Sequence, residues 1–488
     1  MHRMAPKGKR VETLLFPHHS LPGAFDFLIS TATINLNPMK ISLEDLKSKK
    51  VAILGFGLEG QSLANYFEKK GIKFDVLDQN KEVKSELAQN TITGGEYFDN
   101  LTKYQYIFRS PGIRNYLPEI VEAKKAGVEI SSLTKLFFDL SPAKIIGVTG
   151  TKGKGTTSTL VYKILKSEIE SVYLGGNIGE SPLDFLDKLT SKSLVVLELS
   201  SFQLVDLERS PQVAVVLMVT SEHLDWHKST DEYLEAKANI VSHQQKDDIS
   251  VINADYPNSL LVGGKSGGQK YLFSRKTSVS KGTYVMGKEF LFKVGETAEV
   301  VAKTYEIGLI GKHNFENILA SILVGKVFNI SNQNIAGTLK EFTGLPHRLE
   351  HIANIKGIDF YNDSFSTTPE TSIAAIGSFE RGEILILGGS SKNSDFSKLG
   401  EVIGQSPNVR IVILIGQEAL RIKAVLANYK GKIVEGLKSM QEIVQTASKM
   451  AKEGEVVILS PACASFDMFN NYKQRGDKFR EEVEKLRG

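Results

Sequence analysis

Residues 147–157 read GVTGTKGKGTT, at the end of the apolar run Lys144–Val148 and ahead of a helix-forming stretch. Glycines at this spacing let the backbone curl so that successive N–H groups point inward, and the N-terminus of the following helix favours an anion. The strand, the loop, its lysine and its hydroxyls therefore predict a phosphate-binding loop, with Lys154 reaching the β- and γ-phosphates of a nucleotide. A glycine-rich turn with an exposed lysine is the plainer interpretation, and it accounts for fewer of these features.

One position of the loop departs from the usual phosphate loop, in which a Ser or Thr follows the lysine and binds Mg²⁺. Here Gly155 follows the lysine, so the metal has to use the hydroxyl of Thr156 or a water molecule. The expected ATP-binding residues of the loop are Gly150, Thr151, Lys152, Gly153, Lys154, Gly155, Thr156 and Thr157.

Beyond the loop, strand-like apolar runs alternate with helix-periodic stretches along almost the whole chain, which indicates an α/β fold with mainly parallel sheets. At roughly 150 residues per domain, 488 residues correspond to about three domains. We expect a Rossmann-like domain at 45–141, a central P-loop ATPase-like domain at 142–345 and a Rossmann-like domain at 346–488. Residues 1–44 are expected to be an extension that is disordered or comes from an upstream start. The segment 271–309 has short β-rich runs and predicts a small antiparallel insertion.

Composition excludes several classes of protein. The chain is 41% hydrophobic and 24% charged, which argues against disorder and fibrous repeats. A net charge of +4 is too small to indicate a nucleic-acid-binding protein. No uncharged apolar run reaches about 18 residues, so we expect no insertion into a membrane. The single cysteine, Cys463, excludes an intramolecular disulfide, fits a reducing compartment and is expected to be a packed residue.

A second glycine motif, GFGLEG at residues 55–60, also follows a strand and opens a helix, and Asp78 ends the next strand. This pattern is typical of dinucleotide binding. It fits equally a fold that cradles another diphosphate, including that of a nucleotide sugar. Nothing later in the chain looks like a hydride-transfer site, so a dehydrogenase is the weaker interpretation.

Seven further strings follow the phosphate loop. They are GGNIG at 175–179, LELSSFQL at 197–204, TSEHLDWH at 220–227, GKHNFEN at 311–317, GLPHRLE at 344–350, NDSFSTTPE at 362–370 and SPACASFDMFNNYKQRG at 460–476. In order and spacing, over about residues 45–488, these strings resemble the Mur ligases. The earlier strings resemble the whole superfamily, folylpolyglutamate synthases included, whereas the last resembles the branch that adds D-glutamate.

The resemblance implies an ATP-dependent acid–D-amino-acid ligase of peptidoglycan synthesis, and hence of cell-wall biogenesis, cell shape and cell division. ATP would phosphorylate the carboxylate of UDP-N-acetylmuramoyl-L-alanine to an acyl phosphate, which the amine of D-glutamate attacks, with Mg²⁺ as cofactor. We expect a monomer in the cytoplasm, where ATP and UDP-sugars are found, with small-molecule substrates and no nucleic acid as partner.

The catalytic residues that the resemblance implies are Lys154, Glu198, His223 and Lys237. Glu198 ends one apolar strand and His223 follows another, so both would emerge at the carboxyl edge of the sheet and hold Mg²⁺. Thr156 is the further candidate ligand. Lys237, in YLEAKANI, alone favours a surface lysine, but by resemblance it is the lysine that these ligases carbamylate, which requires burial or nearby cations to lower its pKa.

The remaining site residues also come from the resemblance. The ATP site is completed by Asn314, Asn317, Arg348 and Asp363. The UDP-sugar site comprises Leu58, Glu59, Asp78, Ser110, Gly112, Asn177 and Gln203. The amino-acid site comprises Thr367, Lys392, Ser465 and Phe466. Closure of the third domain would then be required for catalysis.

Three residues depart from the family pattern and keep alternatives open. Gly155 replaces the expected hydroxyl, Phe365 stands where many D-glutamate ligases carry lysine, and Ser390 stands where an acid is common. One alternative is a ligase that adds L-glutamate or acts on another UDP-muramoyl or folate substrate, although the last string argues against folate. The other is a nucleotide-binding protein without turnover, for which Gly155 is the best support.

Overall fold

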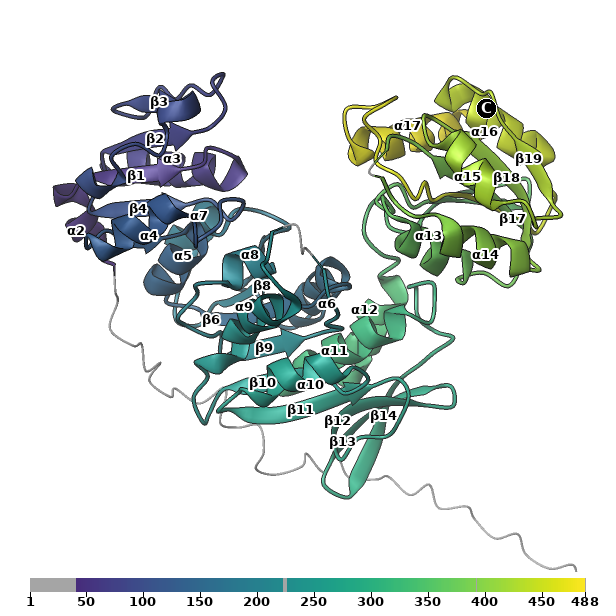
Figure 1. Ribbon diagram of the computed structural model, residues 1–488. Helices are drawn as coiled ribbons and strands as arrows, with labels where there is room; N and C mark the ends of the chain where they lie inside the picture. Colours follow the sequence, from purple (N-terminus) through teal and green to yellow (C-terminus); the bar gives the residue numbers. More distant parts are fainter. Residues whose placement is uncertain (1–40, 223–225, 392, 488) are drawn as a thin grey trace, which may run out of the picture.

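The computed structural model describes residues 41–222, 226–391 and 393–487. Within them the chain forms three consecutive α/β units, each built on its own sheet (Figure 1). The predicted fold class, three α/β domains with mainly parallel sheets, is confirmed. The predicted extension at 1–44 lies almost entirely outside the described residues, and the domain limits stay predictions.

The first sheet is wholly parallel, with the strand order β3-β2-β1-β4-β5. Its strands are β1 (Val51–Leu54), β2 (Phe74–Asp78), β3 (Thr91–Thr93), β4 (Tyr106–Arg109) and β5 (Glu129–Ser131). Its helices are α2 (Leu43–Ser48), α3 (Leu58–Lys70), α4 (Pro118–Lys125) and α5 (Leu133–Leu140). Every residue of β1 is buried, as expected for a strand covered on both faces.

The second sheet has the order β14-β13-β12-β11-β10-β9-β6-β8-β7. The parallel part contains β6 (Lys144–Thr149), β7 (Val172–Gly176), β8 (Leu194–Glu198), β9 (Val213–Val216), β10 (Ile249–Asn253), β11 (Gln269–Ser274) and β12 (Lys281–Met286). Antiparallel pairing adds β13 (Glu289–Val294) and β14 (Thr297–Lys303). The expected antiparallel segment is therefore present, but it extends the main sheet because β12 pairs in parallel with β11.

Seven helices accompany this sheet among the described residues. They are α6 (Lys154–Lys166), α7 (Pro182–Phe185), α8 (Ser201–Leu204), α9 (Thr230–Ser242), α10 (Pro257–Gly264), α11 (Asn314–Val327) and α12 (Asn332–Glu341). Helices α6 and α11 pack against each other, so the start of α11 lies beside the phosphate loop.

The third sheet has the order β15-β16-β20-β17-β18-β19, and only the β15–β16 pair is antiparallel. Its strands are β15 (Glu350–Ile355), β16 (Ile358–Asn362), β17 (Glu383–Gly388), β18 (Val409–Ile415), β19 (Lys432–Val434) and β20 (Val456–Leu459). Its helices are α13 (Pro369–Ile376), α14 (Ser397–Gln405), α15 (Ala419–Val425), α16 (Met440–Met450) and α17 (Tyr472–Glu484).

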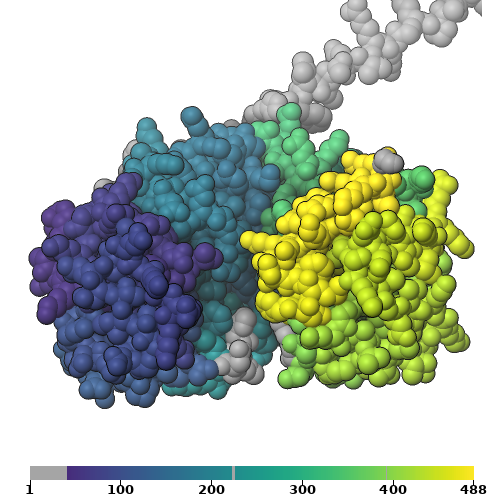
Figure 2. Space-filling view, turned by 90° about the horizontal axis from the view of Figure 1, so that it is seen from above, coloured from purple at the N-terminus to yellow at the C-terminus, as the bar shows by residue number. Residues whose placement is uncertain are grey.

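The first two domains are packed together more closely than the third is packed on either. One apolar cluster runs from the first domain into the second, where Phe137 meets Phe185 edge to face at 6.0 Å. The third domain has separate apolar clusters of its own. Figure 2 shows the first and third domains on opposite sides of the central one, with a hollow between them. No helix in the described ranges has the length and apolar character that a membrane crossing requires.

Candidate active site

The phosphate loop lies between β6 and α6, as the sequence predicts. Gly153 has a φ of +87°, in the left-handed region that favours glycine. The loop is fastened to the segment after β9, because the Thr151 N–H donates to the carbonyl of Met218 at 2.7 Å and Thr151 Oγ1 accepts the N–H of Thr220 at 3.0 Å. Lys154 opens α6, and its Nζ donates to the carbonyl oxygens of Gly150 and Thr151 at 3.0 and 3.1 Å.

A second lysine meets the same loop from helix α9. Lys237 is 1% exposed, and its Nζ donates to the carbonyl of Gly150 at 2.9 Å and to Thr149 Oγ1 at 3.3 Å. Burial holds the pKa of Lys237 well below its usual value, and the neighbouring charge of Lys154 lowers it further. The segment's sequence alone favoured a surface lysine; the fold instead buries Lys237 behind the phosphate loop.

Glu198, at the end of β8, supplies the carboxylate nearest the start of α6. Its Oε1 accepts a hydrogen bond from Asn177 Nδ2 at 3.2 Å, whereas its buried Oε2 has no hydrogen-bond partner among the described residues. A β-carbon at Gly155 would lie 3.1 Å from this Oε2 atom. An unpartnered carboxylate oxygen beside a phosphate loop fits a magnesium ligand, since Mg²⁺ takes one or two carboxylates together with phosphate oxygens.

The structure shows less about the other expected metal ligands. Thr156 is buried in the first turn of α6, and His223 lies outside the described residues. Across the described ranges, no group of three or more His, Cys, Asp or Glu side chains is arranged to hold a metal ion. Of the expected magnesium ligands, the structure describes Glu198, Thr156 and Lys237, and their role as ligands stays a prediction.

Asn314 and Asn317 lie buried in the first turn of α11, where both side-chain amides bind protein groups. Asn314 donates to the carbonyl of Ile310 at 2.7 Å, and Asn317 donates to Asn314 Oδ1 at 2.8 Å. Thr157 Oγ1 in turn donates to Asn317 Oδ1 at 3.2 Å. These contacts tie α11 to α6, and the adenine-facing role of the two asparagines stays a prediction.

Arg348 lies at the start of α6, whereas Asp363 is bound within the third domain. A β-carbon at Gly155 would lie 3.5 Å from Arg348 Nη2, so the guanidinium reaches the start of α6. The Asp363 carboxylate accepts hydrogen bonds from the Leu349 N–H and from the hydroxyls of Ser366 and Ser460, at 3.1, 2.5 and 2.7 Å. Burial raises the pKa of Asp363 to about 6. The Asp363 carboxylate thus already binds three donors of its own domain. Its ribose-binding role stays a prediction.

The residues expected at the UDP-sugar site differ in their surroundings, and two of them bind each other. Gln203 Nε2 donates to Glu59 Oε1 at 2.8 Å across the interface between the first two domains. Asp78 accepts the N–H of Phe56 at 2.6 Å, and Leu58 is exposed. The Asn177 side chain donates a hydrogen bond to Glu198, as described above.

Ser110 and Gly112 lie in the turn after β4. The Ser110 N–H donates to the carbonyl of Leu54 at 2.8 Å. The carbonyl of Gly112 accepts a hydrogen bond from Trp226 Nε1 at 3.1 Å, which joins the turn to the central domain.

Three of the residues expected at the amino-acid site follow the ends of strands in the third sheet: Thr367 comes after β16, and Ser465 and Phe466 come after β20. Ser465 is buried, Phe466 is exposed, and the Phe466 N–H donates to Ser390 Oγ at 3.0 Å. Thr367 precedes α13 and is partly buried, whereas Lys392 lies outside the described residues. Cys463 is buried, and burial raises its pKa to about 12, so it is not a reactive thiol.

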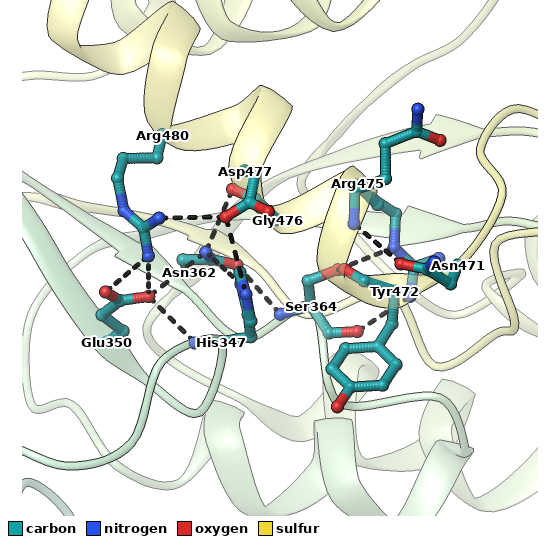
Figure 3. A network of polar contacts seen from close by, with 11 residues as sticks. His347, Glu350, Asn362, Ser364, Asn471, Tyr472, Arg475, Gly476, Asp477 and Arg480 are labelled. Atoms are coloured by element: carbon teal, nitrogen blue, oxygen red, sulfur yellow. Dashed lines mark hydrogen bonds and ion pairs between the residues drawn. The ribbon is translucent and has the colours of Figure 1, made fainter. Parts of the chain in front are cut away.

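A buried arginine that the sequence does not single out joins the segments that follow these two strands, and Figure 3 shows it beside Ser364. Arg475 is 1% exposed and donates to Ser364 Oγ and to the carbonyls of Ser364, Cys463 and Ala464, at 2.9 to 3.1 Å. The residue lies in the last of the strings quoted above, but nothing in the string reveals that its side chain is enclosed.

Family models match three parts of the chain. They describe the N-terminal domain of MurD-like Mur ligases at residues 49–132, the Mur ligase middle domain at 148–325 and the glutamate ligase domain of Mur ligases at 347–463. A UDP-N-acetylmuramoylalanine–D-glutamate ligase from Acetivibrio thermocellus is 40% identical, over 90% of this chain and 97% of its own. A protein of the same name from Ruminiclostridium cellulolyticum is 35% identical, over 92% and 100% of the two chains.

Solved structures show the same fold. A crystal structure of MurF from Acinetobacter baumannii aligns with a TM-score of 0.59 at 14% identity, over 91% of this chain and 98% of that one. The UDP-N-acetylmuramate-alanine ligase MurC from Thermotoga maritima aligns with a TM-score of 0.55 at 18% identity, over 90% and 99%. At this identity the likeness concerns the fold alone.

Proposed function

Because this chain belongs to the Mur ligase family, we propose that it is an ATP-dependent ligase that adds D-glutamate to UDP-N-acetylmuramoyl-L-alanine. The relatives at 35–40% identity bear the name of this activity and are matched over nearly their full length. The observation in the structure that carries the proposal is the meeting of Lys154, Arg348 and the unpartnered oxygen of Glu198 at one phosphate loop.

The proposed reaction forms and breaks two bonds in turn. An oxygen of the substrate carboxylate attacks the γ-phosphorus of ATP, the bond to the β,γ-bridging oxygen breaks, and ADP leaves. The glutamate amine then attacks the acyl carbon, phosphate leaves, and the nitrogen loses a proton. Two negative groups meet in the first step, so positioned cations matter more than a nucleophilic side chain. Lys154 and Arg348 are the cations that we assign to this task.

We assign magnesium to a place beside these cations. We assign Glu198 and Thr156 as protein ligands, with His223 as a further candidate outside the described residues. When bound, the ion neutralises phosphate oxygens and so favours the approach of a carboxylate. The fit rests on the buried carboxylate oxygen of Glu198, which has no protein donor among the described residues.

Lys237 is proposed to be carbamylated. Carbamylation needs the neutral amine, and burial together with the charge of Lys154 lowers the pKa of Lys237 in that direction. The expected product is an anion next to Thr149 and Gly150. With ¹³C-bicarbonate, we expect a carbamate carbon signal that K237A lacks; equal spectra for the two proteins would exclude the modification.

The two other substrates are assigned to the outer domains. The UDP-sugar is placed at the first domain, with Leu58, Ser110 and Gly112 among its contacts and Asn177 and Gln203 near its muramoyl part. Glutamate is placed at the third domain, where a dicarboxylate requires cations and N–H or O–H donors. We expect the protein to act as a monomer in the cytoplasm.

The proposal is tested by measuring phosphate release with ATP, magnesium and UDP-N-acetylmuramoyl-L-alanine, offering D- and L-glutamate in separate reactions. Release that requires all three substrates and prefers D-glutamate is the expected result. Equal rates with L-glutamate would contradict the assigned amino acid. ADP binding without any turnover would contradict ligase activity and favour a nucleotide-binding protein, the alternative that Gly155 supports.

A further inference from the structure

The linker that enters the third domain holds Arg348 between two residues in an unusual backbone conformation. His347 has a φ of +63° and Leu349 a φ of +44°, in a region that residues other than glycine seldom adopt. Such a conformation persists only where its surroundings enforce it. The linker must therefore be held by specific contacts.

Figure 3 shows these contacts around His347. The N–H of His347 donates to Glu350 Oε2 at 2.9 Å, and Asn362 Nδ2 donates to His347 Nδ1 at 3.0 Å. Arg480 of helix α17 binds both oxygens of Glu350, at 2.6 and 2.7 Å. A β-carbon at Gly476 would lie 2.2 Å from His347 Nδ1, so α17 packs directly on the imidazole. These contacts of His347 and Glu350 hold the backbone on both sides of Arg348.

The Arg348 guanidinium lies over an aromatic ring of its own domain. The guanidinium carbon is 3.8 Å from the centroid of the Phe365 ring. Phe365 is itself held edge to face against Tyr472, with ring centroids 5.0 Å apart, and its N–H donates to the carbonyl of His347 at 2.9 Å. Between described residues, no hydrogen bond or ion pair engages the guanidinium, although the Glu198 carboxylate at the phosphate loop acts on it as an opposite charge.

One nitrogen of the guanidinium, Nη2, lies close to the central domain. A β-carbon at Gly155 would lie 3.5 Å from Arg348 Nη2 and 3.3 Å from Leu345 Cδ1. A side chain at position 155 would therefore press on the linker and on the edge of the guanidinium. Because Gly155 has no side chain, Arg348 can lie against the first turn of α6, beside Lys154 and the phosphate loop.

We propose that Phe365 is a positioning residue for nucleotide binding, because its ring holds one face of the Arg348 guanidinium and leaves the N–H edge directed at the phosphate loop. A planar guanidinium can stack by its face and bind a phosphate by its edge at the same time, which a lysine ammonium cannot do. The inference rests on the proposed function, since it assigns a phosphate group of ATP to that edge.

The test compares three single variants. F365L keeps an apolar side chain but removes the aromatic face, F365Y keeps the face, and R348K keeps the charge but loses the plane. We expect F365L to raise the KM for ATP about 5- to 10-fold, within the range of a desolvated cation–π contact. The KM values for UDP-N-acetylmuramoyl-L-alanine and glutamate should not change. F365Y should restore the KM for ATP.

A double variant separates positioning from a general effect on folding. If Phe365 acts only through Arg348, F365L should add nothing once R348K has removed the planar group. A wild-type KM for ATP in F365L, a defect in F365Y equal to that of F365L, or multiplied effects in the double variant would each overturn the inference.

Calorimetry with the non-hydrolysable β,γ-imido analogue of ATP, which keeps the γ-phosphate, makes this test independent of turnover. We expect F365L and R348K to weaken binding of the analogue, F365Y to preserve it, and the double variant to match R348K. If the wild type binds the analogue but releases no phosphate from ATP with all three substrates, the ligase proposal fails, and the analogue affinities still decide the role of Phe365. Equal affinities for the analogue in the wild type and F365L would overturn the role even in an active ligase.

Discussion

The chain contains two glycine loops with the same local design. The segment 55–60 joins β1 to α3, and the segment 147–155 joins β6 to α6. Each follows a buried parallel strand at the carboxyl edge of a sheet, and each contains a glycine in the left-handed region, with φ of +90° at Gly55 and +87° at Gly153. From the backbone alone, both could receive a phosphate group.

The two loops differ in the charges that surround them. At the first loop Asp78 accepts the N–H of Phe56, Glu59 is enclosed one turn later, and the nearby guanidinium of Arg109 donates to protein carbonyls in the turn after β4. At the second, Lys154 and Lys237 both donate to the carbonyl of Gly150. The spacing of glycines thus specifies a backbone shape, whereas side chains from distant elements determine how favourable the loop is for a polyphosphate.

The largest expected effect comes from removing the cation that distinguishes the second loop. K154A should lower kcat by about 10²-fold or more, the usual loss for one preorganised charge donor. K163A, on the exposed side of the same helix α6, is the matched control and should behave as the wild type. Phosphate release in the presence of all three substrates measures both. Unchanged turnover in K154A would remove the distinction between the loops.

A somewhat smaller effect is expected at the second lysine of that loop. K237A should lower turnover about 10- to 100-fold, as is common when a group that supports a metal site is lost. If Lys237 acts as a carbamate, added formate or acetate should restore part of the rate, since a short carboxylate can occupy the space that the side chain leaves. Full activity without any addition would contradict a role for Lys237 at the metal site.

The contrast between the loops also separates what local sequence predicts from what it does not. The phosphate loop and the place of Glu198 at a strand end follow from strand, glycine and helix signals close together in the chain. The burial of Lys237 depends on how α9 packs behind β6, and the contact between Glu59 and Gln203 depends on how two domains meet. Such contacts join residues tens to hundreds of positions apart, and no local pattern encodes them.

Two departures from the family pattern show the same limit more sharply. By sequence alone, Gly155 and Phe365 are unexpected residues, and each weakens one assignment. In the structure both lie against Arg348, one beside its N–H edge and the other under its face. Their positions are 210 residues apart, so their relation is visible only once the domains are assembled.

A smaller effect is expected from matched glycine substitutions in the two loops. A β-carbon at Gly153 would lie 2.3 Å from Asn317 Oδ1 and would require a left-handed backbone, whereas no atom lies within 4 Å of a β-carbon at Gly57. Strain of about 1–3 kcal/mol should make G153A bind ADP about 10-fold more weakly. G57A should bind ADP as the wild type does. Calorimetry decides, and equal affinities for the two variants would contradict a strained second loop.

The smallest expected effect concerns Glu59, the enclosed acid of the first loop. Its Oε1 accepts a hydrogen bond from Gln203, and its buried Oε2 has no hydrogen-bond partner among the described residues. Burial, the largest cause, raises the pKa of Glu59 above its usual value. The folded state therefore binds the proton of the Glu59 carboxyl group more tightly than the unfolded state does. The stability that the group contributes is complete below its unfolded pKa, about 4.3, and is lost as the pH rises through the folded pKa.

E59Q has no charge to bury, so at pH 8 it should be more stable than the wild type by about 1 kcal/mol, and the difference should close as the pH falls toward 4. Denaturant unfolding of the two proteins at pH 5, 6.5 and 8 measures this. E68Q, at an exposed position of the same helix α3, is the control and should show no such pH dependence. A pH-independent difference, or an E59Q protein that is less stable at pH 8, would mean that the first loop uses the charge of Glu59, and the contrast with the second loop would then need a different cause.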